Sequence, residues 1–215
     1  MLVVRQVAVG PFAENTYVLG CTETRDALVV DPGGELDRVL ALAEPDGLVV
    51  KGIFLTHAHV DHAAGCSELQ RRLGVGAQLH ADDREWLEAL PHQAEMFGFD
   101  GPVLVPRIDR WHEDGDEVPV GRQRGRVIHT PGHTRGSCAL HFAEAKQLVT
   151  GDTLFAGSVG RTDLPGGDFE ALERSIRERL FTLGDDVRFW PGHGPSALVG
   201  DERLENPFVG VRARR

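Results

Sequence analysis

One stretch constrains this chain more than any other: a histidine-rich segment that directly follows its most apolar run. Residues 56–62 read Thr-His-Ala-His-Val-Asp-His. The run that leads into them, LVVKGIFLT, is nearly continuous in apolar and β-branched residues and is bounded by polar turn residues. This pattern predicts a buried strand. A fold for this chain therefore has to bring ionisable side chains to the end of a strand that lies inside its core.

The spacing within this segment suits metal binding. In extended backbone His57 and His59 point to one side, because side chains alternate with a period of two. Asp61 and His62 fall at the entrance of the helix that follows and can face a second point nearby. Four imidazole and carboxylate donors within six residues can thus address two adjacent cations. Asp61 is also an ordinary candidate for the N-cap of that helix, and the two roles are compatible.

Three further donors occur in the same kind of setting. His133 lies in Thr-Pro-Gly-His-Thr, Asp152 in Thr-Gly-Asp-Thr and His193 in Pro-Gly-His-Gly, and each follows a stretch that is typical of a strand. Glycine-containing turns after strands converge at one edge of a sheet. We therefore expect these side chains to join the segment 56–62. The other histidines lack such a setting and are expected to be structural or surface residues: His80, His92, His112, His129 and His141.

The rest of the pattern predicts strands in runs, followed by strands that alternate with helices. Strands are expected at residues 2–9, 15–21, 26–34, 48–56, 77–81, 126–130, 137–142, 146–150 and 187–190. Helices are expected at residues 35–43, at 61–74, at 81–90 (ended by Pro91), and from Asp168, which caps a helix with Phe169, Leu172, Ile176 and Leu180 on one face. Residues 91–102 fit neither pattern and are expected to form a loop. This order indicates a layered α/β domain of mixed sheets covered by helices.

Length and composition narrow the class of protein. With 215 residues, 41% of them hydrophobic and 26% charged, the chain is expected to form a single globular domain over residues 1–215. A net charge of −10 disfavours nucleic acid as a partner. No apolar run reaches the ~20 residues of a membrane helix and the start lacks a signal-peptide pattern, so no membrane partner is expected. Three widely spaced cysteines fit neither a disulfide framework nor a cysteine-type zinc site, which favours a cytoplasmic location.

The full set of donors resembles the metallo-β-lactamase superfamily in its glyoxalase II-like form. The likeness extends from NTYVLG and VVDPG near the start to PGHGP near the end. It implies an αββα sandwich of two mixed sheets flanked by helices, with two divalent metal ions at one edge, zinc being expected and iron or manganese the alternatives. It also implies a role for Asp31, which would steady a ligand, although the sequence alone fits a turn former equally well. The implied metal ligands are His57, His59 and His133 for one ion and Asp61, His62 and His193 for the second, with Asp152 bridging.

Two segments give a finer resemblance. GSVGRTDLPGGD (157–168) and the tail GPSALVGDERLENPFV are similar to the short bacterial glyoxalase II-like hydrolases. This implies a hydrolase for a small-molecule thioester such as an S-hydroxyacylglutathione, in which a metal-bridging hydroxide attacks the acyl carbonyl and Asp61 and Asp152 are the catalytic carboxylates. GRTD also occurs in mononuclear iron persulfide dioxygenases, so that activity is an alternative, as is a lactone or ester hydrolase of the same fold. Only 22 residues follow His193, so no separate C-terminal helical domain for glutathione binding is expected.

Two smaller expectations concern the substrate. Arg161 sits in a glycine-rich loop, and its guanidinium suits a substrate that carries a carboxylate. The alternative for Arg161 is a surface ion pair with Asp163. Met96, Phe97 and Phe99 are expected to fill the core, with an apolar flap over the substrate as their alternative role.

Overall fold

The computed structural model describes residues 1–99 and 101–213. The chain divides into two compact units. Unit 1 comprises residues 1–112 and 118–124, and unit 2 comprises residues 113–117 and 125–215. Two six-stranded sheets and one two-stranded sheet make up the β structure of the described residues.

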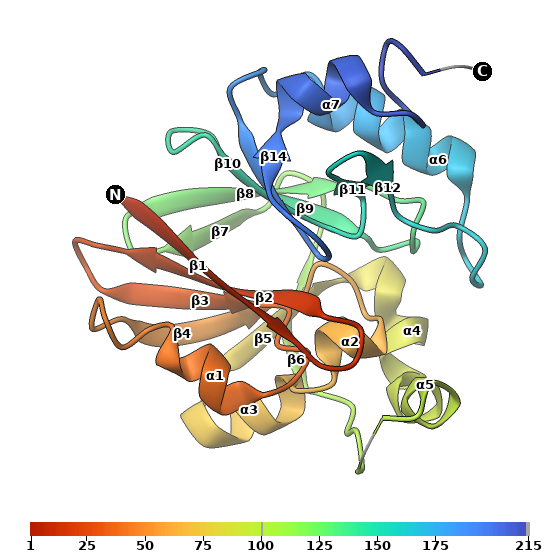
Figure 1. Ribbon diagram of the computed structural model, residues 1–215. Coiled ribbons are helices and arrows are strands. Elements are labelled where there is room, and N and C mark those ends of the chain that lie inside the picture. The colour runs from red at the N-terminus through yellow and green to blue at the C-terminus, as the bar shows by residue number, and fades with distance from the viewer. Residues whose placement is uncertain (100, 214–215) are drawn as a thin grey trace. The chain divides into compact units, whose positions relative to one another are not determined.

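Unit 1 contains a mixed sheet with the strand order β1-β2-β3-β4-β5-β6 (Figure 1). Neighbours from β1 to β3 are antiparallel and those from β3 to β6 are parallel. The strands are β1 (Leu2–Val9), β2 (Glu14–Cys21), β3 (Asp26–Val30), β4 (Val49–Phe54), β5 (Gly76–His80) and β6 (Ile108–His112). The helices are α1 (Leu36–Ala41), α2 (Val60–Ala63), α3 (Cys66–Leu73), η1 (Ala81–Asp83), α4 (Arg84–Glu88) and α5 (Leu90–Phe97). In chain order these helices lie between successive parallel strands, because a parallel pair needs a crossover connection.

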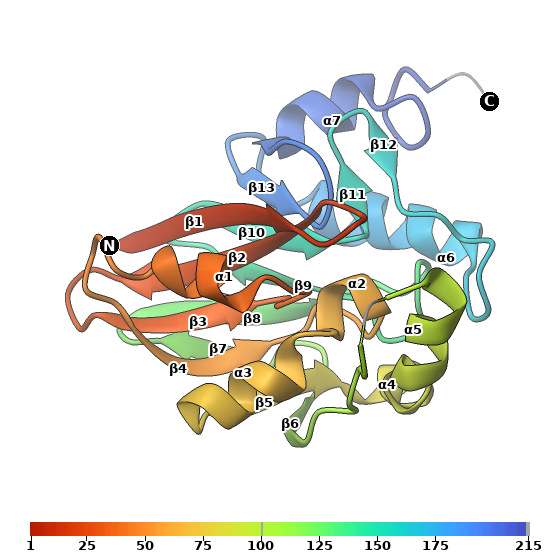
Figure 2. The same ribbon diagram turned by 60° about the horizontal axis from the view of Figure 1, so that its bottom comes forward.

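Helices α1 and α3 pack on one face of this sheet (Figure 2). Val39 of α1 and Leu69 of α3 belong to one core cluster with Val29 of β3 and Ile53 of β4, and all four side chains are buried. Burying an aliphatic side chain of this size stabilises the fold by roughly 1.5–3 kcal/mol. The same packing fixes the ends of β3 and β4, from which the candidate metal-binding segment leaves the sheet.

Unit 2 is built on the second mixed sheet, of order β14-β13-β10-β9-β8-β7, in which only β10 and β13 are parallel among the pairs that have a described register. Its strands are β7 (Glu117–Val120), β8 (Gln123–His129), β9 (Cys138–Phe142), β10 (Gln147–Gly151), β13 (Arg188–Pro191) and β14 (Ala197–Leu198). The tip of β7 and β8, residues 118–124, is grouped with unit 1. A small sheet pairs β11 (Leu154–Phe155) with β12 (Ser158–Val159). Helix α6 (Phe169–Arg174), its π-helical continuation η2 (Ser175–Leu180) and α7 (Val199–Glu205) follow.

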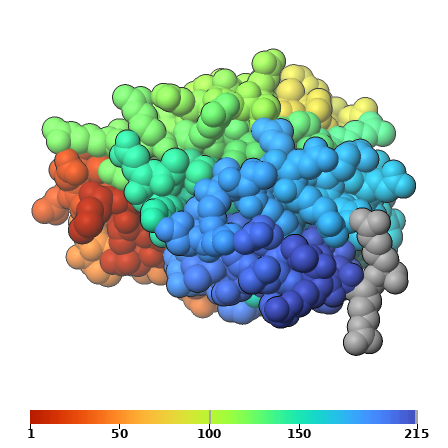
Figure 3. All heavy atoms as spheres, turned by 90° about the horizontal axis from the view of Figure 1, so that it is seen from above, coloured from red at the N-terminus to blue at the C-terminus, as the bar shows by residue number. Residues whose placement is uncertain are grey.

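The helices of unit 2 cover its sheet on one side. Leu172 and Ile176 of the α6–η2 segment and Val199 of α7 share a core cluster with Ala139 of β9 and Leu148 of β10. The outer surfaces of the two helical segments are neighbours in the space-filling view (Figure 3). Two mixed six-stranded sheets with flanking helices are the architecture that the sequence predicts.

The helix predicted over residues 61–74 is interrupted at Gly65. A Cβ atom there would lie 2.5 Å from the carbonyl oxygen of Pro32, and the Gly65 N–H donates a hydrogen bond of 2.9 Å to that same oxygen. The chain therefore turns away between α2 and α3. The predicted end of the second piece is confirmed, because Gly74 caps α3 in the left-handed conformation that glycine adopts without strain.

The loop expected at residues 91–102 is wrong for its first half. Leu90 to Phe97 form helix α5, and residue 100 lies outside the described residues. Pro91 occupies the first turn of α5, where its missing N–H costs nothing, so it starts this helix instead of only ending the previous one. The helix from Asp168 is confirmed, and the Asp168 carboxylate accepts a hydrogen bond of 3.0 Å from the Ala171 N–H. Phe169, expected on the packed face of that helix, is 42% exposed.

Two further features bear on the class of protein. Cys21, Cys66 and Cys138 are free and buried, as expected for a chain without a disulfide framework. Within residues 1–99 and 101–213, no helix combines the length and the apolar character that crossing a membrane requires.

Candidate metal centre

In unit 1 the end of strand β3 holds the beginning of the histidine-rich segment. Asp31 directly follows β3 and has a left-handed backbone with a φ of 51°. Its carboxylate accepts a hydrogen bond of 2.7 Å from the Thr56 N–H and one of 2.6 Å from the Thr56 hydroxyl. Charge-assisted bonds of this kind are roughly twice as strong as neutral ones. Asp31 therefore ties the exit of β4 to the exit of β3, which is consistent with both roles considered for it.

Three buried imidazoles gather immediately after this junction. The ring centroid of His57 lies 4.1 Å from that of His62 and 4.8 Å from that of His59. The Nδ1 atom of His57 is 3.0 Å from the Thr56 hydroxyl, and the Nδ1 atom of His62 is 3.0 Å from Asp31 Oδ2. A ligating histidine is typically held through its other ring nitrogen in this way, which leaves Nε2 for the metal.

Carboxylates complete the donor set of unit 1. Ligand atoms of Asp31, His57 and His62 lie within 4.8 Å of one another. The Oδ2 atom of Asp61 is 3.7 Å from His62 Nε2. The N-cap of α2 is His59, so Asp61 lies in the first helical turn and is not the cap. Imidazole and carboxylate donors in one buried cluster are chemically suited to zinc, iron or manganese.

In unit 2 one carboxylate lies between two imidazoles. The Asp152 Oδ2 atom is 3.6 Å from His133 Nε2 and 3.6 Å from His193 Nε2. These distances are too long for good hydrogen bonds. Two donors bonded to one tetrahedral zinc ion at roughly 2.1 Å each would lie about 3.4 Å apart. The spacing of these atoms is therefore that of metal ligands, and the donor set fits such an ion.

The local structure of unit 2 explains how these side chains meet. Asp152 directly follows β10, His193 follows β13, and His133 lies in the turn between β8 and β9. The strands β8, β9, β10 and β13 are consecutive neighbours in the sheet. The Nδ1 atom of His133 lies 2.8 Å from the carbonyl oxygen of Arg161, which holds the ring with Nε2 toward Asp152.

Glu14 is a buried carboxyl beside the histidines of unit 1 that the sequence pattern does not single out. Its Oε1 atom is 3.8 Å from His62 Nδ1, and its Oε2 atom accepts a hydrogen bond of 3.0 Å from the Thr16 hydroxyl. Burial raises the pKa of Glu14 well above its usual value; the nearby His62 opposes the shift and Asp31 adds to it. Glu14 therefore keeps its proton to a higher pH than an exposed glutamate does.

Two more residues that the sequence pattern does not single out hold the backbone of the same segment. Asp83, at the end of η1, accepts a hydrogen bond from the Ala58 N–H, and Gln93 of α5 bonds to both Ala58 and Val60. Nothing local in the sequence marks either residue, because each acts on a part of the chain that is at least 25 residues away.

The side chain of Arg161 pairs with Asp163. Its guanidinium forms two parallel hydrogen bonds, of 2.7 and 2.8 Å, with the Asp163 carboxylate. This surface ion pair with Asp163 is the alternative role considered for Arg161. The arginine side chain is 57% exposed. The backbone of Arg161 is nevertheless part of the site's support through the His133 contact.

The expectation that Met96, Phe97 and Phe99 fill the core is wrong for the first two. Met96 is 63% and Phe97 37% exposed, whereas Leu90, Gln93 and Ala94 of the same helix are buried. Phe99 is partly buried against the core. The ring of Phe12, from the turn between β1 and β2, lies 5.9 Å from the rings of both Phe97 and Phe99, so these aromatics form a small cluster at the surface of unit 1.

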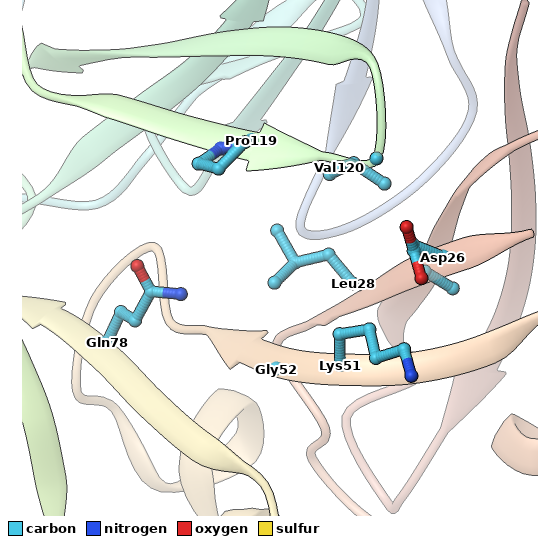
Figure 4. Close-up of a pocket in the computed structure, with 9 residues that line it drawn as sticks. Asp26, Leu28, Lys51, Gly52, Gln78, Pro119 and Val120 are labelled. Atoms are coloured by element: carbon cyan, nitrogen blue, oxygen red, sulfur yellow. The ribbon is translucent and has the colours of Figure 1, made fainter. Parts of the chain in front are cut away.

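A pocket of about 300 Å³ in unit 1 lies apart from the predicted ligands. Leu28 points into it, with Lys51, Gln78 and Asp26 around the opening and Val120 opposite (Figure 4). Leu28 lies before the end of β3 that leads to Asp31. Each residue of a strand advances the chain by roughly 3.3 Å. None of the residues that line the pocket is a predicted ligand. The candidate site is therefore defined by its donor atoms and not by this cavity.

Comparison with known proteins agrees with this donor chemistry. The family model described as "Metallo-beta-lactamase superfamily" matches residues 9–193. The chain belongs to the metallo-beta-lactamase superfamily. Its buried clusters of histidine and aspartate, together with this membership, make it a metallo-hydrolase of that superfamily.

Relatives of nearly the same length are known. Hydroxyacylglutathione hydrolase GloC of Haemophilus influenzae is 35% identical over 210 residues, which cover 96% of this chain and 98% of that protein. A solved structure of TTHA1623 in a di-iron-bound form is 38% identical, with a TM-score of 0.85 and coverage of 95% of this chain and 99% of that one. The BLEG-1 B3 metallo-beta-lactamase structure is 32% identical, with a TM-score of 0.88 and coverage of 96% and 99%.

Proposed function

We propose that this protein is a dinuclear metallohydrolase that cleaves a small-molecule thioester, such as an S-hydroxyacylglutathione. The observation that carries the proposal is the pair of donor sets, one in each unit, whose imidazole and carboxylate atoms have the spacing of metal ligands. Similarity to the GloC hydrolase over nearly the whole chain supports the substrate class. The single-domain organisation and the cytoplasmic location expected from the sequence belong to the same proposal.

The two donor sets are proposed to serve one centre. His57, His59 and His133 would hold one ion, and Asp61, His62 and His193 would hold the second, with Asp152 bridging them. Three features support this assignment: the three rings of unit 1 lie within 4.8 Å of their neighbours, Asp152 is equidistant from two imidazoles, and Asp31 orients His62. Asp61 and Asp152 would be the catalytic carboxylates.

The chemistry of such a centre favours thioesters. The proposed ligands would hold two divalent ions, which would supply hydroxide near neutral pH from a bound water and polarise the acyl carbonyl. A thiol has a pKa of about 8.5, so the leaving thiolate departs without a proton donor. An amide nitrogen needs one, and among the described residues we assign no general acid. The buried ligands would keep the metal site largely screened from bulk water.

Recognition of the thiol carrier would fall on Arg161. Its guanidinium is exposed and already paired with a carboxylate, that of Asp163, and a carboxylate of a glutathione-derived substrate could exchange with it. The neighbouring backbone carbonyl supports His133. An anchor in this loop would therefore lie close in space to His133, one proposed ligand of the centre.

Zinc is the proposed metal, and iron is the alternative that a specific observation favours. TTHA1623, 38% identical to this chain, has been solved in a di-iron-bound form. The GRTD segment, residues 160–163, also occurs in mononuclear iron persulfide dioxygenases, which is the second candidate function.

The test is a pair of assays on protein of measured metal content. We expect about two ions per chain, hydrolysis of lactoylglutathione, and loss of that activity on chelation with recovery on addition of zinc. One iron per chain with oxygen consumption on glutathione persulfide would replace the proposal with the dioxygenase. Cleavage of a lactone or a β-lactam but of no thioester would keep the metal chemistry and overturn the substrate class.

A further inference from the structure

Gln93 is a buried glutamine that bonds to three backbone groups of the metal-binding region. Its Oε1 atom accepts a hydrogen bond of 3.0 Å from the Val60 N–H. Its Nε2 atom donates to the carbonyl oxygens of Ala58, at 3.2 Å, and Trp86, at 2.8 Å. Only 2% of the residue is exposed. The amide group thus connects the histidine-rich segment to the α4–α5 pair of helices.

Two of the three groups that Gln93 binds lie on either side of His59. Ala58 and Val60 are the neighbours of His59 in the chain, and the Ala58 N–H donates a further bond of 2.8 Å to Asp83 Oδ2. The His59 ring packs edge-on against Trp86, with centroids 4.6 Å apart and an interplanar angle of 89°. The residues 83–93 therefore contact His59 through its ring and through the backbone on both sides.

The other two histidines of unit 1 have side-chain contacts at their rings. His57 and His62 have an Nδ1 atom beside Thr56 or Asp31, so their rings are oriented through side-chain oxygens. At His59 the structure fixes the path of the backbone on both sides of the residue. Val60 is the first residue of α2, and its N–H has no acceptor within that helix. The Oε1 atom of Gln93 supplies that acceptor.

We propose that Gln93 is a positioning residue that fixes His59 as a metal donor, with Asp83 and Trp86 completing the support. The inference rests on the proposed function, because it takes His59 to be a ligand. A glutamine suits this role because it accepts one hydrogen bond and donates two at the same time. Methionine has a similar length but can make none of these three hydrogen bonds.

The experiment compares Gln93→Met with a matched control, Gln70→Met. Gln70 of α3 also binds backbone with both ends of its amide, donating to the Arg107 carbonyl at 2.8 Å and accepting from the Arg107 N–H at 3.2 Å. It has no bond to the histidine-rich segment. Zinc affinity is measured on the apo proteins by competition with a chromophoric chelator, and the ligand field is read from the visible spectrum of the cobalt(II) proteins.

We expect Gln93→Met to weaken one of the two zinc sites by about 10-fold or more, the effect typical of losing a group that supports a ligand. Its cobalt spectrum should change, whereas Gln70→Met should match the wild type in both measurements. Gln93→Glu retains the acceptor for Val60 but sets a second acceptor oxygen against the carbonyl oxygens of Ala58 and Trp86, so we expect its zinc affinity to fall in the same direction. This variant keeps the side-chain volume and serves if Gln93→Met does not fold.

Equal zinc affinities and equal cobalt spectra for the Gln93 variants and Gln70→Met would overturn the inference. That result is distinct from failure of the proposed function, in which the wild-type protein itself would bind fewer than two ions or leave thioesters intact. Neither readout requires turnover, so a change of substrate class leaves the test of Gln93 valid.

Discussion

At the scale of single residues, the unusual feature of this protein is a carboxylate that lies between two imidazoles at the same distance from each. Asp152 Oδ2 is 3.6 Å from the Nε2 atoms of both His133 and His193. These distances are too long for good hydrogen bonds but match the spacing of two ligands on one metal ion. The proposed centre would account for this arrangement, with Asp152 and His133 on one cation and Asp152 and His193 on the second.

Replacing Asp152 with asparagine tests this interpretation. The variant keeps the shape of the side chain and removes its charge, so we expect loss of metal and a fall in thioester kcat/KM of about 100-fold or more. Metal content by mass spectrometry and steady-state kinetics measure the two effects. Asp186→Asn is the control, since Asp186 is an exposed aspartate paired with Lys146. An Asp152→Asn protein with two ions and wild-type kinetics would contradict the assignment.

Arg161 and Asp163 give a second prediction at this scale, with a defined pH dependence. The Arg161 guanidinium lowers the pKa of Asp163 to about 2. A carboxylate with a lowered pKa stabilises the folded state fully above its ordinary pKa, and this contribution is lost as the pH falls through about 2. In Arg161→Ala the pKa of Asp163 should therefore rise toward its usual 3.8, which an NMR titration measures.

The same variant tests the role of Arg161 in binding. We expect the KM for an anionic thioester to rise several-fold in Arg161→Ala, with little change in kcat, because the guanidinium would bind a carboxylate remote from the reacting bond. Asp163→Asn releases the guanidinium and should not raise the KM. A KM that is unchanged in Arg161→Ala would leave Arg161 as one half of a surface ion pair.

At the scale of elements, the residues that could be predicted from the sequence are those whose role is local. His133, Asp152 and His193 each follow a strand within a few residues, so a strand pattern and a glycine turn are enough to mark them. Gln93 could not be predicted, because its partner Val60 is 33 residues away and the sequence predicts a loop for the segment around it. Glu14 could not be predicted for the same reason, since its environment is created by Asp31 and His62, which are distant from it in the chain.

The turn before His133 provides a prediction at this scale. Gly132 has a φ of 140°, and a Cβ there would lie 2.4 Å from the backbone N and Cα atoms of Leu172 in α6. Backbone cannot yield as a flexible side chain does, so Gly132→Ala should lower the free energy of unfolding by about 2 kcal/mol or more and displace His133. Chemical denaturation and zinc affinity measure both effects.

Gly157→Ala separates the clash from the backbone strain. Gly157 also has a positive φ, of 71°, but no atom lies within 4 Å of the position of its Cβ. It should show only the smaller cost of the left-handed conformation, which is about 1 kcal/mol, and retain its zinc affinity. If both variants lose the same stability, contact with α6 is not what requires glycine at position 132.

At the scale of the whole molecule, the donors are shared between two compact units. His57, His59, Asp61 and His62 belong to unit 1, and His133, Asp152 and His193 belong to unit 2. The sequence predicts the two sheets and the donors, because strand patterns and motifs are local. Whether both sets bind the same ions depends on packing between distant segments, which no local pattern encodes. The effect of zinc on the thermal stability of ligand variants tests whether both sets bind the same ions.

A ligand that binds only the folded state stabilises it by an amount that grows with its concentration, reaching about 4 kcal/mol at a thousand times its dissociation constant. For a chain of this length that corresponds to an increase in Tm of about 10 °C. We expect zinc to raise the Tm of the chelated wild-type protein by this order. His57→Ala in unit 1 and His193→Ala in unit 2 should each lose most of the increase, whereas the exposed His92→Ala should keep it. An increase that survives in either ligand variant would mean that the ions bind within one unit, and the proposal of a shared dinuclear centre would then be wrong.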